Sequence, residues 1–440
     1  MIEQIPESLS ERRLDMVPNF PDRQEPVGFM LRLVKALHTY GVPTYELERL
    51  VTTVAEQLGY GLQIIAVPTS ITMTFMQEDE EEKPRTYVIR SNSGEVNVDK
   101  LRRTMEVAEK VIEGGLTTQQ GANELTEIAK SQPVHNNFWM IFCFSLVSAS
   151  IARIFNGGWQ EVLTASVIGL LVGFLVNLGG PRSETVSNLM PALCAFFASI
   201  ISFACNQWLG LHSTYIPIVA GIIILVPGMM LTIAMAELAT QNLVSGTARL
   251  LGAGMIFIQM TFGVAIGSQL ANYLFPLTER IELVALPNWT LWVALVATSW
   301  SFMVLFQSRW KELPWIIVAT LSAYFISRWG VQQMGPATGA FIGALSVGLF
   351  ANLAHRIRKV STAAIMMPGF IILVPGSIGF KSLTALLEHD IIGGLETAFN
   401  MVIIGISLVT GLLISSIATL PKVNLVKASV NDHKDNEEVV

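Results

Sequence analysis

The chain has 440 residues, of which 51% are hydrophobic and only 14% are charged, against roughly 25% in a typical soluble domain. This composition excludes an ordinary soluble enzyme. The charge is also unevenly distributed, because residues 1–133 hold 35 of the 62 Asp, Glu, Lys and Arg residues, 21 acidic and 14 basic, and the remaining 307 residues hold 13 acidic and 14 basic. The chain therefore joins a polar region to an apolar one.

The same pattern disfavours several partners. Charge beyond residue 133 is nearly balanced, so no polybasic surface for nucleic acid is expected. Cys143, Cys194 and Cys205 lie in apolar runs without ligand-type spacing, which predicts buried thiols rather than a disulfide or a metal site, and no cofactor is expected. The first twenty residues lack the apolar core of a secretory signal, so the polar region is predicted to stay cytosolic.

The polar region is predicted to be a small cytosolic α+β domain over residues 26–133, preceded by a flexible segment over residues 1–25. Helical periodicity covers residues 26–40, 43–58, 98–113 and 117–131, and β-rich runs cover residues 61–67, 71–76 and 86–90. No catalytic motif organises His38 and its neighbours, and a lone histidine at a helix end is more typical of a cap or a packed polar residue. An enzyme is therefore not expected.

Ten apolar stretches follow, each about as long as the 17–25 residues that span a bilayer. They cover residues 138–155, 160–178, 188–209, 213–235, 248–275, 288–306, 313–329, 336–354, 362–384 and 391–418. We predict a polytopic α-helical membrane protein with five spans in residues 134–278 and five in residues 279–420. Residues 421–440 are predicted to form an acidic cytosolic tail.

Lys and Arg in the short connections predict the orientation, because cytosolic loops retain these residues. With a cytosolic amino terminus, the inside segments carry nine, namely Arg182, Arg249, Arg309, Lys311, Arg356, Arg358, Lys359, Lys422 and Lys427. The outside loops carry four, namely Arg153, Arg280, Arg328 and Lys381. This bias predicts that both termini are cytosolic.

An internal repeat links the two sets of spans. The string GIIILVPG at residues 221–228 recurs 148 residues later as GFIILVPG at residues 369–376. Because each copy holds five spans, an odd number, the second copy enters the membrane from the opposite side. Two inverted five-helix repeats are typical of secondary transporters.

The repeated Pro-Gly pair is the candidate substrate-binding element. Proline removes a helical hydrogen bond, and non-helical backbone at membrane depth is tolerated only where protein or water satisfies it. Pro227, Gly228, Pro375 and Gly376 are therefore predicted to line a hydrated cavity. The alternative is a pair of kinks that only improve helix packing.

Ionisable and amide side chains within the spans complete the candidate site, because such groups are costly in lipid and are usually paired or functional. Glu237 and Glu396 are candidates for proton coupling, and Arg249 for binding a substrate carboxylate. Asn177 and Asn352 lie in similar contexts near the ends of two spans and could also bind substrate. Interfacial exposure for the charges and cross-helix hydrogen bonds for the amides are the alternatives.

Several motifs in combination resemble the threonine/serine exporter family, which includes fungal pheromone-regulated membrane proteins. They are His38-Thr39-Tyr40-Gly41, Tyr45-Glu46-Leu47-Glu48, Pro68-Thr69, Asn156-Gly157-Gly158-Trp159, Ile224-Leu225-Val226-Pro227-Gly228 and Gly246-Thr247-Ala248-Arg249. The resemblance covers about residues 26–418. Some bacteria encode the two five-span units as separate polypeptides associated with succinate export, whereas here they are fused, as in the amino-acid exporters.

The resemblance implies proton-motive-force-driven export of L-threonine and L-serine by alternating access. A dicarboxylate exporter of the succinate type, a channel, and a sensor with a membrane-tethered binding domain are the alternatives. The expected partners are a small-molecule substrate, membrane lipid and further copies of the chain, and the expected location is a bacterial inner or plasma membrane.

Overall fold

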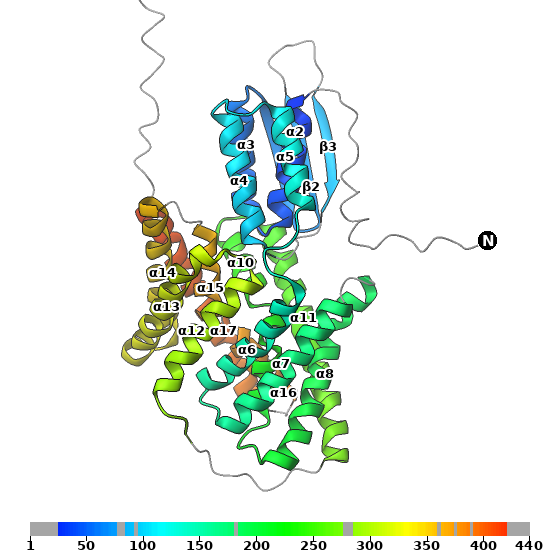
Figure 1. The fold of residues 1–440 in the computed structure, drawn as a ribbon, viewed down its shortest axis with the longest axis vertical. Coiled ribbons are helices and arrows are strands. Elements are labelled where there is room, and N and C mark those ends of the chain that lie inside the picture. The colour runs from blue at the N-terminus through cyan, green and yellow to red at the C-terminus, as the bar shows by residue number, and fades with distance from the viewer. Residues whose placement is uncertain are drawn as a thin grey trace, which may run out of the picture.

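The computed structural model describes residues 25–76, 84–91, 96–179, 184–275, 285–358, 362–373, 376–387 and 390–419. In these ranges, a layer of short helices and strands lies at one end of a bundle of longer helices (Figure 1). The predicted flexible segment up to residue 24, the acidic tail at residues 421–440 and Pro375 lie outside the described residues.

The layer at the end of the bundle contains four helices and a three-stranded sheet among the described residues. Its elements are α2 (Glu25–Thr39), α3 (Thr44–Gln57), β1 (Gly61–Val67), β2 (Ser70–Met76), β3 (Arg85–Arg90), α4 (Val98–Ile112) and α5 (Thr118–Lys130). The sheet is antiparallel in the order β1-β2-β3. Every element starts and ends within one residue of the range predicted for it, and we call this layer the α+β region.

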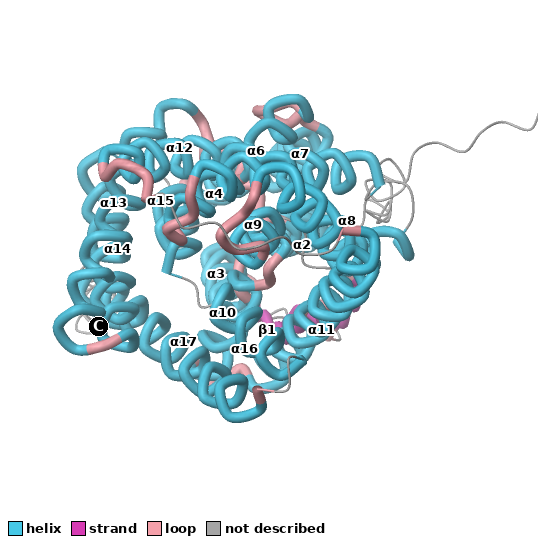
Figure 2. The backbone as a smooth tube through the Cα atoms, turned by 90° about the horizontal axis from the view of Figure 1, so that it is seen from below, coloured by secondary structure: helices cyan, strands magenta, loops and turns pink. Residues whose placement is uncertain are grey.

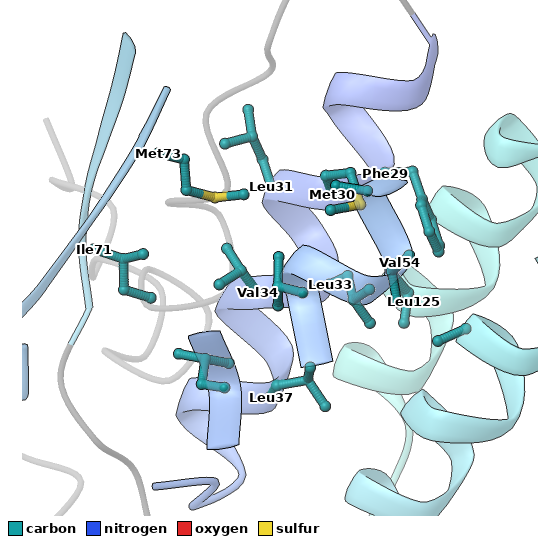
Figure 3. Close-up of a cluster of buried hydrophobic side chains, with 14 of the residues drawn as sticks. Phe29, Met30, Leu31, Leu33, Val34, Leu37, Val54, Ile71, Met73 and Leu125 are labelled. Atoms are coloured by element: carbon teal, nitrogen blue, oxygen red, sulfur yellow. The ribbon is translucent and has the colours of Figure 1, made fainter. Parts of the chain in front are cut away.

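The core of the α+β region is built around α2 (Figure 3). Phe29, Leu33 and Leu37 follow one another at four-residue spacing, so they share a helix face, and all three are buried. Ile71 and Met73 alternate along β2 and face the helices from the sheet side. A single apolar core therefore holds the helices to one face of the sheet.

The bundle consists of helices that coincide with the ten predicted apolar stretches. They are α6 (Asn137–Ile154), α7 (Trp159–Gly179), α8 (Glu184–Leu209), α9 (Tyr215–Ile222) with the 3-10 turn η1 (Ile223–Leu225), α10 (Gly228–Ala239), α11 (Leu243–Leu274), α12 (Trp289–Leu305), the 3-10 turn η2 (Trp310–Glu312), α13 (Leu313–Met334), α14 (Pro336–Arg358), α15 (Thr362–Leu373), α16 (Gly376–Leu387) and α17 (Ile391–Thr419). One stretch is split between α9 and α10, and another contains α15 and α16, between which residues 374–375 lie outside the described residues.

By length and hydropathy, seven of the described helices could cross a membrane, or eight if the bent pair of α9 and α10 counts as one span. The chain is thus a polytopic helical protein. Its outer surface suits lipid, as α11 shows: Leu251, Met255, Ile258 and Phe262 recur on one face of this helix and are all exposed.

The opposite face of α11 packs closely on α8. A Cβ on Gly263 would overlap the Ala192 carbonyl oxygen, so only glycine allows this approach. In the second half of the bundle, α17 packs on α14 in the same way, where a Cβ on Gly411 would overlap the Phe341 carbonyl oxygen. The long helices surround α9, α10 and α15 (Figure 2).

The packing of one half of the bundle is repeated in the other. α7 contacts α9 as α13 contacts α15, and α10 contacts α11 as α16 contacts α17. Contacts between the halves are reciprocal, because α10 packs on α17 while α16 packs on α11, and α6 packs on α12. The two halves are therefore assembled from matching helices in matching neighbourhoods.

Candidate functional site

The first Pro-Gly pair breaks a helix as predicted. α9 continues into the 3-10 turn η1, and the chain then bends by 58° before α10. Pro227 precedes the first residue of α10 with φ −77° and ψ 43°, which is not helical, and both Pro227 and Gly228 are buried. Proline cannot donate to the preceding turn, so the helix ends here.

The second Pro-Gly pair lies at the matching place in the second half, and its glycine meets the first break. α15 ends at Leu373 and α16 begins at Gly376, while Pro375 lies outside the described residues. A Cβ built on Gly376 would lie 2.6 Å from Val226 Cγ1 and 3.4 Å from Gly228 Cα. Gly376 therefore packs directly against the break at Pro227-Gly228, and glycine at residue 376 permits this approach.

The two asparagines occupy different environments. Asn177 Nδ2 donates to the Gly173 carbonyl oxygen of its own helix at 2.8 Å. Asn352 Nδ2 points to the Ser415 carbonyl oxygen of α17 at 3.4 Å, a cross-helix contact. Both side chains are half-buried. These hydrogen bonds link neither asparagine to Glu237 or Arg249.

Glu237 and Arg249 form a buried ion pair where the bundle meets the α+β region. Arg249 Nε donates to Glu237 Oε1 at 3.1 Å and to Glu237 Oε2 at 3.0 Å. The side chain of Glu237 is 0% exposed and that of Arg249 is 7% exposed. Glu237 lies near the end of α10 and Arg249 in the second turn of α11. The sequence had singled out both residues but not their pairing. They lie at this junction rather than beside the Pro-Gly breaks.

The α+β region completes the coordination of Glu237. Thr44, the first residue of α3, donates to Glu237 Oε1 from its backbone N at 3.2 Å and from Oγ1 at 2.7 Å. Tyr45 packs against the apolar cluster of Leu231 and Met235 from α10 and Val409 from α17. Residues in or beside the Tyr45-Glu46-Leu47-Glu48 motif thus contact both halves of the bundle.

His38 lies behind this ion pair and is fully buried. Its Nδ1 is 3.1 Å from Ser91 Oγ. Burial and the positive charge of Arg249 lower the pKa of His38 to about 4, so the imidazole is neutral near pH 7. The expectation of a packed polar histidine agrees with this environment.

Glu48 and Ser245 hold the β1–β2 turn against the bundle. Glu48 Oε1 accepts from the Ala66 backbone N at 2.7 Å, and Ser245 Oγ donates to the Ala66 carbonyl oxygen at 3.0 Å. Burial raises the pKa of Glu48, the bond from Ala66 lowers it, and the charge of Glu237 raises it. Ser245 is on α11, so this contact adds a second link between the two regions.

A second attachment joins the start of α4 to the connection between α12 and α13. The Val98 backbone N donates to the Phe306 carbonyl oxygen at 3.0 Å, and Arg309 Nε donates to Asp99 Oδ1 at 2.6 Å. His135, just before α6, is 2.8 Å from the Ser308 carbonyl oxygen through its Nε2. No local pattern indicates these contacts, which join residues far apart in the chain.

This connection is part of a repeat that the sequence interpretation missed. Residues 306–312 read FQSRWKE and residues 155–161 read FNGGWQE, 151 positions earlier. In both, the second residue has a positive φ, 61° at Asn156 and 56° at Gln307. In both, the final glutamate accepts from the backbone N three residues before it, Glu161 from Gly158 and Glu312 from Arg309.

Glu396 does not join the other candidates. It lies in the second turn of α17 and its side chain is exposed. Glu237, in contrast, is buried and bonded to Arg249 and Thr44. Among the described residues, no group of three or more His, Cys, Asp or Glu side chains is arranged to hold a metal ion.

Taken together, long apolar helices, an outward apolar face and a helix broken inside the bundle define an integral membrane protein of the transporter type. The comparisons agree with this class. Residues 28–271 match the family described as "Putative threonine/serine exporter", and residues 290–418 match "Threonine/Serine exporter, ThrE". The chain belongs to the threonine/serine exporter family.

Curated relatives are fungal. The chain is 24% identical over 404 residues to "Pheromone-regulated membrane protein 10" of Eremothecium gossypii, covering 90% of this chain and 53% of the relative. It is 25% identical over 389 residues to the protein of the same name from Debaryomyces hansenii, covering 84% and 37%. The chain thus spans about half or less of the length of these relatives. No solved structure matches it.

Proposed function

We propose that this protein is a secondary exporter of small hydrophilic amino acids, L-threonine and L-serine above all, driven by the proton motive force. It works by alternating access between two inverted repeats of five spans, ten in total, with the α+β region and both termini in the cytosol. The contact between Gly228 and Gly376 carries the proposal, because it joins the repeated Pro-Gly motifs of the two halves at one point.

The direction of matching helices supports the inversion. His135 lies just before α6 and contacts the connection at residues 306–312. Phe306, the first residue of that connection, lies just after α12 and contacts the α+β region. α6 therefore begins at the end of the bundle where α12 ends. Since α6 and α12 are the first helices of the two repeats, the repeats run in opposite directions.

The break itself is suited to a polar substrate. A helix interrupted inside a bundle presents helix termini and backbone dipoles that can stabilise charges of either sign. A zwitterionic amino acid carries one charge of each sign. We propose that it binds beside Pro227, Gly228, Pro375 and Gly376, with the amides of Asn177 and Asn352 on the approaches to this point.

The ion pair at the junction is suited to coupling and gating. Arg249 donates to both oxygens of Glu237 through Nε, and we propose that its guanidinium also receives a carboxylate arriving from the cytosol. We propose that protonation of Glu237 breaks its bonds to Arg249 and loosens the hold of Thr44, opening the cytosolic side. Glu396, exposed on α17, is proposed as a second proton carrier.

Transport by the purified full-length chain in liposomes tests the proposal. A pH gradient should drive labelled threonine and serine uphill, and alanine less well. Movement of succinate alone would replace the substrate while keeping the mechanism, and flux that never exceeds equilibration would indicate a channel. Binding without flux would indicate a sensor. The curated relatives are fungal, so a bacterial inner membrane stays a prediction.

A further inference from the structure

A cavity of about 420 Å³ lies between α13 and α15, beside the second helix break. α13 contributes Tyr324, Ser327, Arg328 and Gln332, while Ile372 and Leu373 come from the end of α15. Small-molecule sites commonly measure about 300–1,000 Å³ and combine apolar walls with a few polar groups. The volume and lining of this cavity meet both conditions.

The polar residues of α13 face the cavity because of their spacing. Tyr324, Ser327 and Arg328 stand at the first, fourth and fifth positions of one helical stripe, so their side chains share a face. Phe325 lies on another face, where its ring stacks at 4.7 Å on Trp292 of α12. The stripe is thus turned toward α15.

Arg328 has no carboxylate partner among the described residues. Its Nη1 donates to Tyr324 Oη at 3.2 Å, and its guanidinium carbon lies 6.0 Å from the centroid of the Tyr324 ring. Arg328 stands about 22 Å along α13 from Leu313, at 1.5 Å per residue. It is six residues, about 9 Å, from the other end at Met334, and its side chain is exposed. A cation within a membrane helix that has no carboxylate partner calls for an anion or for water.

Comparison with the first repeat shows that the scaffold does not need this cation. Aligning the FNGGWQE and FQSRWKE connections places Arg328 opposite Asn177. Each residue donates to the residue four positions earlier, Asn177 to the Gly173 carbonyl oxygen and Arg328 to the Tyr324 hydroxyl. The local bond is kept, while the positive charge is found in one repeat only.

We propose that Arg328 binds the carboxylate of the transported amino acid in this cavity, oriented by Tyr324 and assisted by the polar groups of Ser327 and Gln332. The inference rests on the proposed function and assigns its substrate-binding cation. Arginine suits the task because its guanidinium can grip a carboxylate with two parallel hydrogen bonds. Leu373, which lines the cavity at the end of α15, is three residues before Gly376 and so places the bound molecule near the repeated motif.

The test measures threonine uptake into liposomes by the full chain and by its R328Q and R328K variants. We expect KM to rise at least 10-fold in R328Q and less in R328K, with a smaller change in kcat. Threoninol, which lacks the carboxylate, should compete weakly for threonine uptake by the wild type. For R328Q, threoninol should compete as well as unlabelled threonine does. R356Q, which alters an exposed arginine on α14, should leave KM within twofold.

Each outcome bears on the inference separately from the proposed function. An R328Q variant with wild-type KM and wild-type preference for threonine over threoninol would overturn the inference. If R328Q does not fold, R328K and Y324F decide, since both should raise KM by a few-fold and an unchanged KM in both would overturn it. If the wild type moves no amino acid, the proposed function fails. Arg328 can then still be tested by measuring threonine binding to the wild type and to R328K in detergent, with threoninol as competitor.

Discussion

The two halves of the bundle share a scaffold and differ in where they hold charge. Glycines at equivalent places, Gly263 and Gly411, bring α11 onto α8 and α17 onto α14. The ion pair of Glu237 and Arg249 has no counterpart, because Ala385 and Thr397 stand 148 residues later. The repeated residues therefore build the fold, whereas the residues found once distinguish its two ends.

This difference assigns distinct tasks to the halves. In the first half, the buried ion pair ties the bundle to the α+β region through Thr44. In the second half, Arg328 faces a cavity about 22 Å along α13 from the start of that helix. Changing a residue found once should alter attachment or transport, and changing a repeated glycine should alter stability in both halves alike.

Breaking the ion pair should have the largest effect. Glu237→Ala leaves the Arg249 guanidinium buried without its partner and should lower the free energy of unfolding by about 3–5 kcal/mol. Denaturant unfolding in detergent micelles measures this. The matched control is the double variant E237L/R249M, which removes both charges and should recover much of the loss. A single variant as stable as the wild type would contradict the buried pair.

Acidification should weaken the α+β region through His38. Its pKa is about 4 in the folded protein and about 6.5 when unfolded, so the folded state binds fewer protons between these values. The stabilisation is complete above about pH 6.5 and is lost as the pH falls toward 4, by up to about 3 kcal/mol. Thermal unfolding measured across this range provides the readout.

Glu48 opposes this trend, because its pKa is raised and protonation favours the folded state. The wild type must therefore be compared with His38→Gln, which cannot titrate. We expect a flatter pH profile in the variant between pH 4 and 6.5. Identical profiles would show that His38 does not control the acid sensitivity.

The glycine contacts should each contribute a smaller and similar amount. Gly263→Ala and Gly411→Ala force a methyl group against a carbonyl oxygen of the neighbouring helix and should each cost about 1–3 kcal/mol. Gly254→Ala on α11 is the control, since no atom lies within 4 Å of its added Cβ, and it should be neutral or slightly stabilising. A large cost in one half alone would argue against equivalent packing.

The pair of Arg309 and Asp99 should matter least. The Arg309 side chain is 49% exposed, and Asp99 also accepts from Arg102 at 3.0 Å, so one hydrogen-bond donor remains after Arg309→Ala. We expect a loss of at most about 1 kcal/mol in thermal or denaturant unfolding. A loss comparable to that of Glu237→Ala would mean that this attachment, rather than the ion pair, holds the α+β region.

Local structure was predictable because it follows from periodicity. The elements of the α+β region agree with prediction to within one residue, since amphipathic spacing and alternating strands mark their ends. The break at Pro227-Gly228 was also predictable, because proline removes a helical hydrogen bond and the following glycine favours a helix less than other residues do. Pro191 within α8 and Pro368 within α15 show that proline alone does not end a helix in this chain.

Contacts across the chain were not predictable in the same way. Thr44 lies 193 residues from Glu237, and nothing in the spacing around either residue indicates the other. Arg328 was predicted to belong to an outside loop because the apolar stretch was expected to end at residue 329, but α13 continues to Met334 and carries Arg328 within the helix. The repeated connection escaped notice because its offset of 151 differs from the 148 of the Pro-Gly repeat.

A reversible cross-link across the two breaks tests the central claim most directly. Val226→Cys and Gly376→Cys, in a chain whose Cys143, Cys194 and Cys205 are replaced by alanine, place two thiols where the side chain at residue 226 already meets residue 376. Threonine flux is then measured in liposomes before and after reduction. We predict that oxidation forms the bond and stops flux, and that reduction restores it. Failure to form the bond, or full flux while it is closed, would contradict a transport path between the breaks.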